Sequence, residues 1–175
     1  MLRPNLEAAN IVDFDDPELF RHPLVYLSEP GYWYPTASEV EGLRTYLQKG
    51  GFLIVDDFHF PREWEVFDTA MRRVLPEARI QRLDVSHPIY NTFFAIKSLD
   101  IPYPGTSGPG ALMGEFYAIF EENDPRKHLM VIINYNMDLG DYLEWSADAN
   151  NRYSLVPTNE AYKFLINYVL YSLSH

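Results

Sequence analysis

Residues 50–59 read Gly-Gly-Phe-Leu-Ile-Val-Asp-Asp-Phe-His, and this stretch decides the fold. Four apolar side chains follow one another from Phe52 to Val55 without polar alternation, which is typical of a strand covered on both faces. Two glycines precede the run and two carboxylates follow it. We therefore predict a buried strand whose carboxyl end carries the pair Asp56 and Asp57.

The residues upstream of Gly50 complete a βαβ unit. The apolar run at 24–27, Leu-Val-Tyr-Leu, predicts a second strand of the same covered kind. Thr36 and Glu39 have the spacing of a capping box, in which both side chains satisfy free N–H groups at a helix start. Apolar residues then recur at helical spacing until Gly50, which supplies a left-handed stop. The order strand, helix, strand predicts two parallel strands.

The residues downstream of His59 predict further elements. Pro61 can open a helix that ends at Pro76, and residues 87–114 are rich in Pro and Gly, as in a long surface loop. A turn near Asp124 joins two strand-like runs into a hairpin. The expected elements after the helix are a strand at 79–83, hairpin strands at 115–121 and 129–135, and a largely buried closing helix at 159–173. The pattern as a whole predicts an α/β fold with a mostly parallel central sheet and helices on both faces.

The length of 175 residues predicts a single domain spanning residues 1–175. The formal net charge of -11 argues against nucleic acid or an anionic membrane as partner, because both require clustered Lys and Arg. No apolar run approaches the roughly 20 residues of a membrane-spanning helix, and no targeting segment is visible. We expect a protein, peptide or carbohydrate partner and no insertion into a membrane.

The absence of cysteine excludes disulfides, thiolate nucleophiles and zinc-thiolate sites. The stretch Gly105 to Pro109 places proline where a G-x-S-x-G nucleophile elbow requires glycine. A phosphate-binding loop of the G-x-x-x-x-G-K type is also absent from the sequence. Hydrolysis by a serine nucleophile and nucleotide hydrolysis are therefore disfavoured.

Polar and aromatic residues gather where the predicted parallel strands end. In open α/β sheets, ligands bind beyond the carboxyl ends of the strands, because loops and helix starts converge there. We therefore predict a ligand-binding edge. Its candidate residues are Glu29, Tyr32, Trp33, Asp56, Asp57, Asn136, Asp138, Asp141, Glu144 and Trp145.

The pair Asp56 and Asp57 has two interpretations. Adjacent carboxylates can bind a divalent cation, with Asp138 as a third candidate ligand, or act in proton transfer. One can instead cap the next helix while the other accepts hydrogen bonds from loop N–H groups. His59 and His87 are candidates for proton transfer, although a His-Pro step such as that at His87 is typical of a fixed turn.

The aromatic residues Tyr32, Trp33 and Tyr34 are equally open to two interpretations. Their rings can stack on a sugar or a peptide, and they can also pack within a loop. Gly140, in the stretch that follows the predicted strand at 129–135, is expected to serve a turn.

The combination of these segments resembles the bacterial family DUF4159. The resemblance covers nearly the whole chain. The matching segments are 16–20, 26–31, 43–57, 87–90, 130–136, 138–145 and 161–171, with His175. The resemblance implies a flavodoxin-like fold similar to that of class I glutamine amidotransferases, in a family whose biochemical activity is not established. Glutaminase activity is excluded, because it needs a cysteine nucleophile.

The resemblance also bears on the segments that precede this domain in family members. Family members often carry an exported leader and one more strand ahead of this region, and neither is visible here. The sequence itself leaves the compartment open, and the family resemblance is compatible with an extracytoplasmic location. Leu143 stands where a family variant carries tryptophan, while the acidic positions are kept.

Two functions of different classes are compatible with these residues. The leading hypothesis is a non-catalytic ligand-binding or protein-interaction module that uses the strand-end edge and needs no cofactor. The alternative is a hydrolase of a sugar or peptide that depends on a divalent cation bound by Asp56 or Asp57 together with Asp138, with His59 or His87 in proton transfer. A third hypothesis is self-association through exposed aromatic loops such as Tyr32 to Tyr34.

Overall fold

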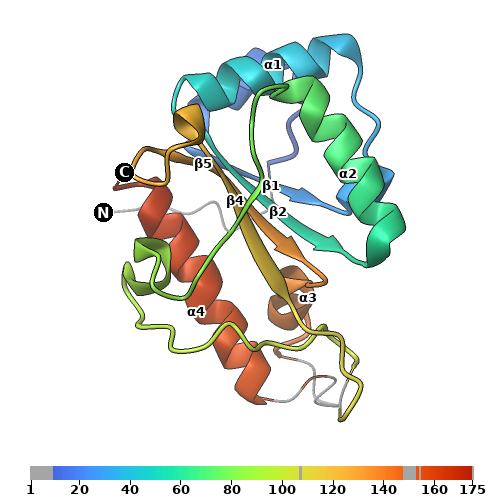
Figure 1. Cartoon of the computed structure of the whole chain (residues 1–175), viewed down its shortest axis with the longest axis vertical. Helices are drawn as coiled ribbons and strands as arrows, with labels where there is room; N and C mark the ends of the chain where they lie inside the picture. The colour runs from blue at the N-terminus through green and yellow to red at the C-terminus, as the bar shows by residue number, and fades with distance from the viewer. Residues whose placement is uncertain (1–9, 107, 148–152, 154, 175) are drawn as a thin grey trace.

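The computed structural model describes residues 10–106, 108–147, 153 and 155–174. Its described part is an α/β fold with an open five-stranded sheet in the order β1-β2-β5-β4-β3. The strands are β1 (Leu24–Ser28), β2 (Phe52–Phe58), β3 (Gln81–Arg82), β4 (Glu115–Phe120) and β5 (Leu129–Tyr135). Figure 1 shows the twisted sheet between its helices.

The sheet is mixed rather than mostly parallel. β1 pairs with β2 and β2 with β5 in parallel, whereas β4 runs antiparallel to both β5 and β3. The hairpin predicted from the turn near Asp124 produces this mixture, because strands joined by a short turn must run antiparallel. β3 has only two residues, fewer than the predicted 79–83. The parallel part is therefore confined to β1, β2 and β5.

Helices cover both faces of the sheet, as the sequence predicts. The helices α1 (Ala37–Gln48) and α2 (Phe60–Val74) lie on one face, and α3 (Leu139–Glu144) and α4 (Leu155–Ser172) lie on the other (Figure 1). Short 3-10 helices connect them. These are η1 (Pro17–Arg21), η2 (Pro30–Tyr32), η3 (Pro88–Asn91) and η4 (Glu121–Asn123).

The first βαβ unit forms for the reasons read from its sequence. The Thr36 hydroxyl accepts a hydrogen bond from the N–H of Glu39 at 3.2 Å, and the Glu39 carboxylate accepts one from the N–H of Thr36 at 2.7 Å. This reciprocal pair is the predicted capping box. Gly50 has a φ of 93°, which residues with a Cβ rarely adopt, and it ends the helix as predicted. The prediction of strand, helix and strand is confirmed here.

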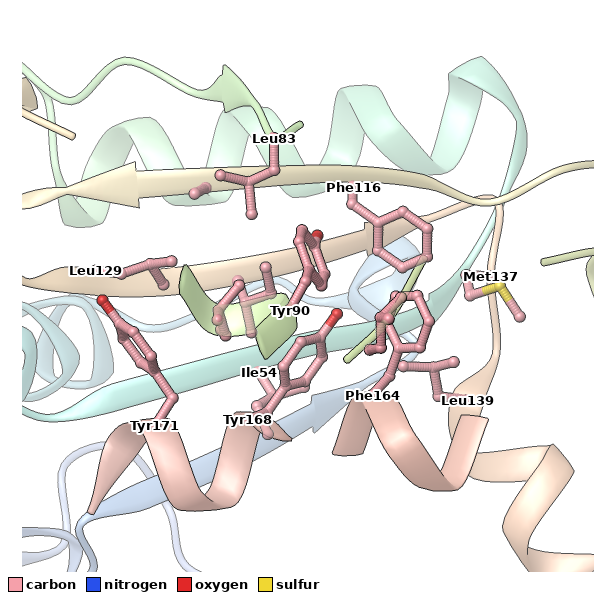
Figure 2. Packing of buried hydrophobic residues seen from close by; sticks show 14 of the residues in the cluster. Ile54, Leu83, Tyr90, Phe116, Leu129, Met137, Leu139, Phe164, Tyr168 and Tyr171 are labelled. Carbon is pink, nitrogen blue, oxygen red and sulfur yellow. The ribbon is translucent and has the colours of Figure 1, made fainter. Parts of the chain in front are cut away.

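The core on the α4 face is built largely from aromatic rings. Phe164 and Tyr168 point from α4 toward the sheet and are fully buried, and Tyr90 meets Phe164 edge-on at 5.6 Å between ring centroids (Figure 2). Phe116 on β4 stacks on Phe164 at 5.0 Å. Burying a large apolar side chain stabilises a fold by about 1.5–3 kcal/mol, so this cluster anchors α4 firmly.

The opposite core lies under α1 and α2. Leu43 of α1 and Phe67 of α2 are fully buried there against Val55 of β2 and Ile133 of β5. Because side chains alternate along a strand, β2 and β5 contribute to both cores and are covered on both faces. β1 was predicted to be covered on both faces, but it is an edge strand of the sheet and its residue Tyr26 is 42% exposed.

The connections that follow β2 and β5 run to opposite faces of the sheet. After β2 the chain enters α2 on one face, and after β5 it enters α3 and α4 on the other. Neighbouring strands whose connections diverge in this way open a crevice at their carboxyl ends, which is the usual ligand position in open α/β sheets. In the described residues, no helix is both long enough and apolar enough to span a membrane.

Candidate functional site

Each of the parallel strands ends in a residue with left-handed backbone geometry. Glu29 follows β1 with a φ of 52°, Asp57 lies near the end of β2 with a φ of 61°, and Asn136 follows β5 with a φ of 53°. Phe60, the first residue of α2, has a φ of 62°. Such conformations are unfavourable for residues with a Cβ and tend to cluster at binding sites, so this edge is locally strained.

Asp56 is fully buried and holds the start of α3. Its Oδ2 atom accepts hydrogen bonds from the Tyr26 hydroxyl at 2.5 Å and from the N–H groups of Leu139 at 2.7 Å and Gly140 at 3.1 Å. Burial raises the pKa of Asp56 to about 6, although the hydrogen bond from Tyr26 lowers it. Asp56 is therefore a cap, but for α3 rather than for the helix that follows it in sequence.

The polar environment of Asp56 continues into the core. Its Oδ1 atom and Nδ2 of Asn134 are both buried and make no hydrogen bond of standard geometry, although the Asn134 amide lies close enough to lower the pKa of Asp56. Oδ1 of Asn134 accepts a hydrogen bond from the Tyr168 hydroxyl at 3.0 Å. Tyr168 of α4 thus fixes the Asn134 side chain, which in turn lies beside the Asp56 carboxylate.

Asp57 and Asp138 lie close together where β2 and β5 end. Asp57 accepts a hydrogen bond from the Ser28 hydroxyl at 3.0 Å, and its carboxyl group lies close enough to that of Asp138 for each to shift the pKa of the other. Asp138 is the N-cap of α3, where its Oδ1 atom accepts a hydrogen bond from the N–H of Asp141 at 2.7 Å. Two carboxyl groups can form a hydrogen bond only when one of them is protonated.

Burial and neighbouring charges keep that proton in place. The pKa of Asp138 is raised to about 8, first by burial and then by the negative charges of Asp57, Asp56 and Asp141. The pKa of Asp57 is also raised by burial, with Glu29 contributing. Because the two groups titrate together, the proton belongs to the pair. The raised pKa values favour a proton on the pair at neutral pH.

No ion pair within the described residues neutralises the carboxylates. We call Asp56, Asp57, Asp138 and Asp141 the strand-end carboxylate site. The Lys, Arg and His side chains of the described residues form their ion pairs with other acidic groups. Repulsion between like charges in a partly buried site is reduced by taking up a proton or a cation.

Aromatic residues from two loops border the site. Burial, and then the negative charges of Asp138 and Asp57, raise the pKa of Tyr103 to about 12. The Tyr103 ring lies 4.9 Å from that of His59, measured between centroids. The Tyr153 hydroxyl donates to Oδ2 of Asp141 at 2.8 Å. Tyr26, Tyr103 and Tyr153 were not predicted, because each contributes from a distant segment.

His59 belongs to the border of the site, whereas His87 does not touch it. His59 is the N-cap of α2, with its N–H bound to Oε2 of Glu63 at 2.7 Å and its Nδ1 atom 3.6 Å from the same oxygen. His87 caps η3 by accepting a hydrogen bond from the N–H of Ile89, and its ring packs beside Phe120. No described contact joins His87 to the carboxylates, so the geometry agrees with its interpretation as part of a fixed turn.

The remaining predicted residues have separate positions. Asn136 accepts a hydrogen bond from the N–H of Phe60 at 3.1 Å and so helps to fix the start of α2. Glu144 and Trp145 lie at the far end of α3 from Asp138. Tyr32 is 70% exposed, and the Trp33 ring packs edge-on against Phe14 at 5.7 Å. The N–H of Trp145 donates to the carbonyl oxygen of Asp141 at 3.1 Å, so Trp145 contacts the site through the backbone of α3.

Gly140 lies in the first turn of α3 and not in a separate turn, contrary to the sequence-based expectation. A Cβ atom at this position would lie 2.8 Å from the hydroxyl oxygen of Tyr26 and 3.4 Å from Oδ1 of Asp138. Glycine is therefore required by the close approach of Tyr26, and its φ is not in the left-handed region.

The described residues contain no group of three or more His, Asp or Glu side chains with the geometry of a metal site. The candidate ligands Asp56, Asp57 and Asp138 thus approach one another without forming a ready-made cation cage. In their present arrangement, these carboxylates accept hydrogen bonds from N–H groups at the start of α3 and from the Ser28 hydroxyl.

The family model of a domain of unknown function, DUF4159, matches residues 3–173. The chain belongs to the DUF4159 family. The match confirms the resemblance inferred from the sequence and includes all of the strand-end carboxylate site. No curated protein matches the chain.

Proposed function

We propose that this DUF4159 domain is a non-catalytic ligand-binding module whose strand-end carboxylate site holds a positively charged amine of a peptide or carbohydrate. The observation that supports the proposal best is the proximity of the Asp57 and Asp138 carboxyl groups, with which no described cation forms an ion pair. Their location beyond the carboxyl ends of β2 and β5 is the usual ligand position of such sheets.

A protonated amine matches this site in charge and in hydrogen bonding. An ammonium group has three N–H donors and no acceptor, whereas ionised carboxylates only accept. Asp57 and Asp138 already share a proton, so an ammonium group would replace that proton with a stronger set of charge-assisted hydrogen bonds. The hydroxyl of Tyr103 and the ring of His59 border the same space and would contact the rest of the ligand.

The finer fold assignment is part of the same proposal. A flavodoxin-like architecture of the class I glutamine amidotransferase kind is supported by the parallel strands β1, β2 and β5 and by helices on both faces. Fold likeness does not carry the glutaminase reaction, and the sequence has no cysteine to perform it. An extracytoplasmic location, compatible with the family resemblance, would suit peptide and carbohydrate ligands.

A hydrolase that depends on a divalent cation is the rival proposal for the same oxygens. The proton shared by Asp57 and Asp138 favours it, because one carboxyl group can act as an acid while the other acts as a base. The lack of a three-residue metal site in the described part of the chain favours simple binding. The two proposals differ in the ligand that stabilises the protein.

Matched pairs of probes test the proposal directly. Glucosamine and N-acetylglucosamine differ in the charge of one nitrogen, as do triglycine amide and its N-acetylated form. Thermal unfolding would be followed with each probe and with Mg²⁺, Ca²⁺, Mn²⁺ and Zn²⁺. A probe at ten times its Kd raises the free energy of unfolding by about 1.4 kcal/mol. We expect stabilisation by at least one charged member of a pair and by neither acetylated partner.

The variants Asp57→Asn and Asp138→Asn assign any effect to the site. Each removes a carboxylate while keeping a polar side chain of similar size. Asp68→Asn is the matched control, because Asp68 lies on α2 in an ion pair with Arg72. The expected result is loss of stabilisation in the two site variants alone. Stabilisation by a divalent metal instead, lost in Asp57→Asn, would support the hydrolase, and no response to any probe would contradict both proposals.

A further inference from the structure

The amino ends of β2 and β5 border a hollow at the opposite edge of the sheet from the strand-end carboxylate site. Its walls come from the end of α1, the segment that follows α2, and the turn between β4 and β5. Strands rise by about 3.3 Å per residue, so the seven residues of β2 place about 20 Å between Gly50, which lines the hollow, and Asp57. Figure 1 shows α3 at the other end of the sheet from the turn between β4 and β5, so the two places are separate.

The walls of this hollow are mostly apolar. Several of them are side chains that the fold itself buries, namely Leu47, Leu75, Phe120 and Met130. The hollow has a volume of about 600 Å³, within the range of about 300–1,000 Å³ typical of small-molecule sites. We call these four residues and the space that they line the Met130 hollow. Because the Met130 hollow is concave and of this size, it suits one small molecule better than the flat surface of a protein partner.

Hydrogen bonds fix the walls relative to one another. Nε of Arg44 on α1 donates to the carbonyl oxygen of Val74 at 2.7 Å, which joins α1 to the end of α2. Asn123 in η4 accepts a hydrogen bond from the N–H of Arg79 at 2.7 Å and donates one to the carbonyl oxygen of Glu77 at 3.0 Å. The three segments that form the walls are thus held in place. A preformed hollow lowers the cost of binding, because little has to be ordered when a ligand enters.

Two exposed carboxylates accompany the apolar walls. Glu77 and Glu121 line the hollow and form no ion pair within the described part of the chain. Arg44 and Glu122 also line it, but each is already paired with a residue outside it. The ring of His128 has its Nε2 atom 3.5 Å from a backbone carbonyl oxygen. A molecule with an apolar body and one positive charge is therefore complementary to the Met130 hollow.

We propose that the Met130 hollow binds a small aromatic or aliphatic molecule that carries one positive charge, such as an arylalkylamine. The apolar part of the ligand packs against Leu47, Leu75 and Met130, and its charged end faces Glu77 and Glu121. A neutral molecule of the same shape gains only the apolar contacts, and an anion is repelled by the two carboxylates. This site is independent of the proposed function, because the strand-end carboxylates lie at the other edge of the sheet.

Three probes with the same phenyl ring and different charges test the proposal, namely phenethylamine, phenethyl alcohol and hydrocinnamate. Titration of the whole chain, followed by two-dimensional NMR of its backbone amides, gives both the Kd and the location of each probe. We expect the amine to bind roughly two- to fivefold more tightly than the alcohol, as for an exposed ion pair, and the anion to bind more weakly than both.

The location of the shifted signals separates this site from the strand-end carboxylate site. The amide signals of Ala78 and Glu121 should shift with phenethylamine, and they should shift equally in Asp138→Asn, whose strand-end site is altered. Shifts confined to Leu139 and Gly140 would place the amine at the strand-end site and overturn the proposal. No shift with any probe, or equal affinities for all three, would also overturn it.

Variants assign the two features of the Met130 hollow. Glu77→Gln combined with Glu121→Gln should lower the affinity for phenethylamine to that for phenethyl alcohol. Both side chains are exposed, so this variant keeps the fold, and Glu65→Gln, exposed on α2 outside the hollow, is its matched control. Ala78→Phe fills the hollow and should abolish binding of both probes, whereas Ala111→Phe, at another half-buried alanine, should not. An unchanged preference for the amine in the double variant, or full binding by a folded Ala78→Phe, would contradict the proposal.

Discussion

Tyr26 on β1 donates its hydroxyl hydrogen to Oδ2 of Asp56 on β2, across 2.5 Å. The same oxygen accepts the N–H groups of Leu139 and Gly140 at the start of α3. One atom therefore joins an edge strand, a central strand and the short helix that carries Asp138 and Asp141. The geometry of the strand-end carboxylate site depends on this junction.

The substitution Tyr26→Phe should destabilise the fold by about 1–2 kcal/mol, because it removes one hydrogen bond to a buried carboxylate. It should also raise the pKa of Asp56 above about 6, since the hydrogen bond from Tyr26 lowers that pKa. Urea unfolding at pH 7 and carboxyl ¹³C NMR measure the two effects. Tyr34→Phe, at an exposed position, is the control. An unchanged Asp56 pKa would show that the hydroxyl does not contact the carboxylate in solution.

The substitution Gly140→Ala should destabilise the fold even though alanine favours helices over glycine by about 1 kcal/mol. The new Cβ would lie 2.8 Å from the Tyr26 hydroxyl oxygen, so one of the two must move. We expect a loss of about 2 kcal/mol in the free energy of unfolding, within the range for overpacked sites. A double-mutant cycle checks the cause. In the background of Tyr26→Phe the loss should shrink, whereas equal losses in both backgrounds would place the clash elsewhere.

At the ends of β2 and β5, local sequence patterns predict the secondary structure but not the long-range contacts. The apolar runs and the capping box of Thr36 and Glu39 are local, so they predict β1, α1, β2 and the location of Asp56 and Asp57 at the sheet edge. The hydrogen bond between Tyr26 and Asp56 spans 30 residues, and that between Leu139 and Asp56 spans 83. Such pairings depend on strand order, which local periodicity does not contain.

The cap on α3 escaped prediction for a related reason. Residues 136–141 contain several polar side chains and one glycine, a composition typical of a loop. α3 is only six residues long and is stabilised from outside by Asp56, so its apolar pattern is too short to detect. The left-handed conformations of Glu29, Asp57 and Asn136 likewise have no reliable signal in residues other than glycine.

The substitution Asp138→Asn should flatten the dependence of stability on pH. The folded pKa of Asp138 is about 8 and its ordinary value is 3.8, so between these pH values the folded state binds a proton that the unfolded state has released. The contribution of Asp138 to the free energy of unfolding must then decrease as pH rises from about 4 to about 8. Asparagine cannot titrate and is also a good N-cap, so the helix start is kept.

The measurement is the thermal unfolding midpoint at intervals from pH 4 to 9. Between pH 5 and 8 the midpoint of wild type should fall relative to that of Asp138→Asn, while Asp68→Asn should follow the wild type. A constant difference between wild type and Asp138→Asn across this range would mean that the pKa of Asp138 is not raised in the folded state.

Calorimetry of amine binding at pH 7 tests the central claim most directly. A positive group at the strand-end carboxylate site must displace the proton shared by Asp57 and Asp138, because it lowers the pKa of both. Titration with the stabilising amine in phosphate and in HEPES, which differ in ionisation enthalpy and contain no primary amine, gives the number of protons released. We predict release of about one proton on binding by wild type, from the shared protonation of such pairs, and no binding heat with Asp138→Asn. Binding without proton release, or equal release by Asp138→Asn, would contradict the account.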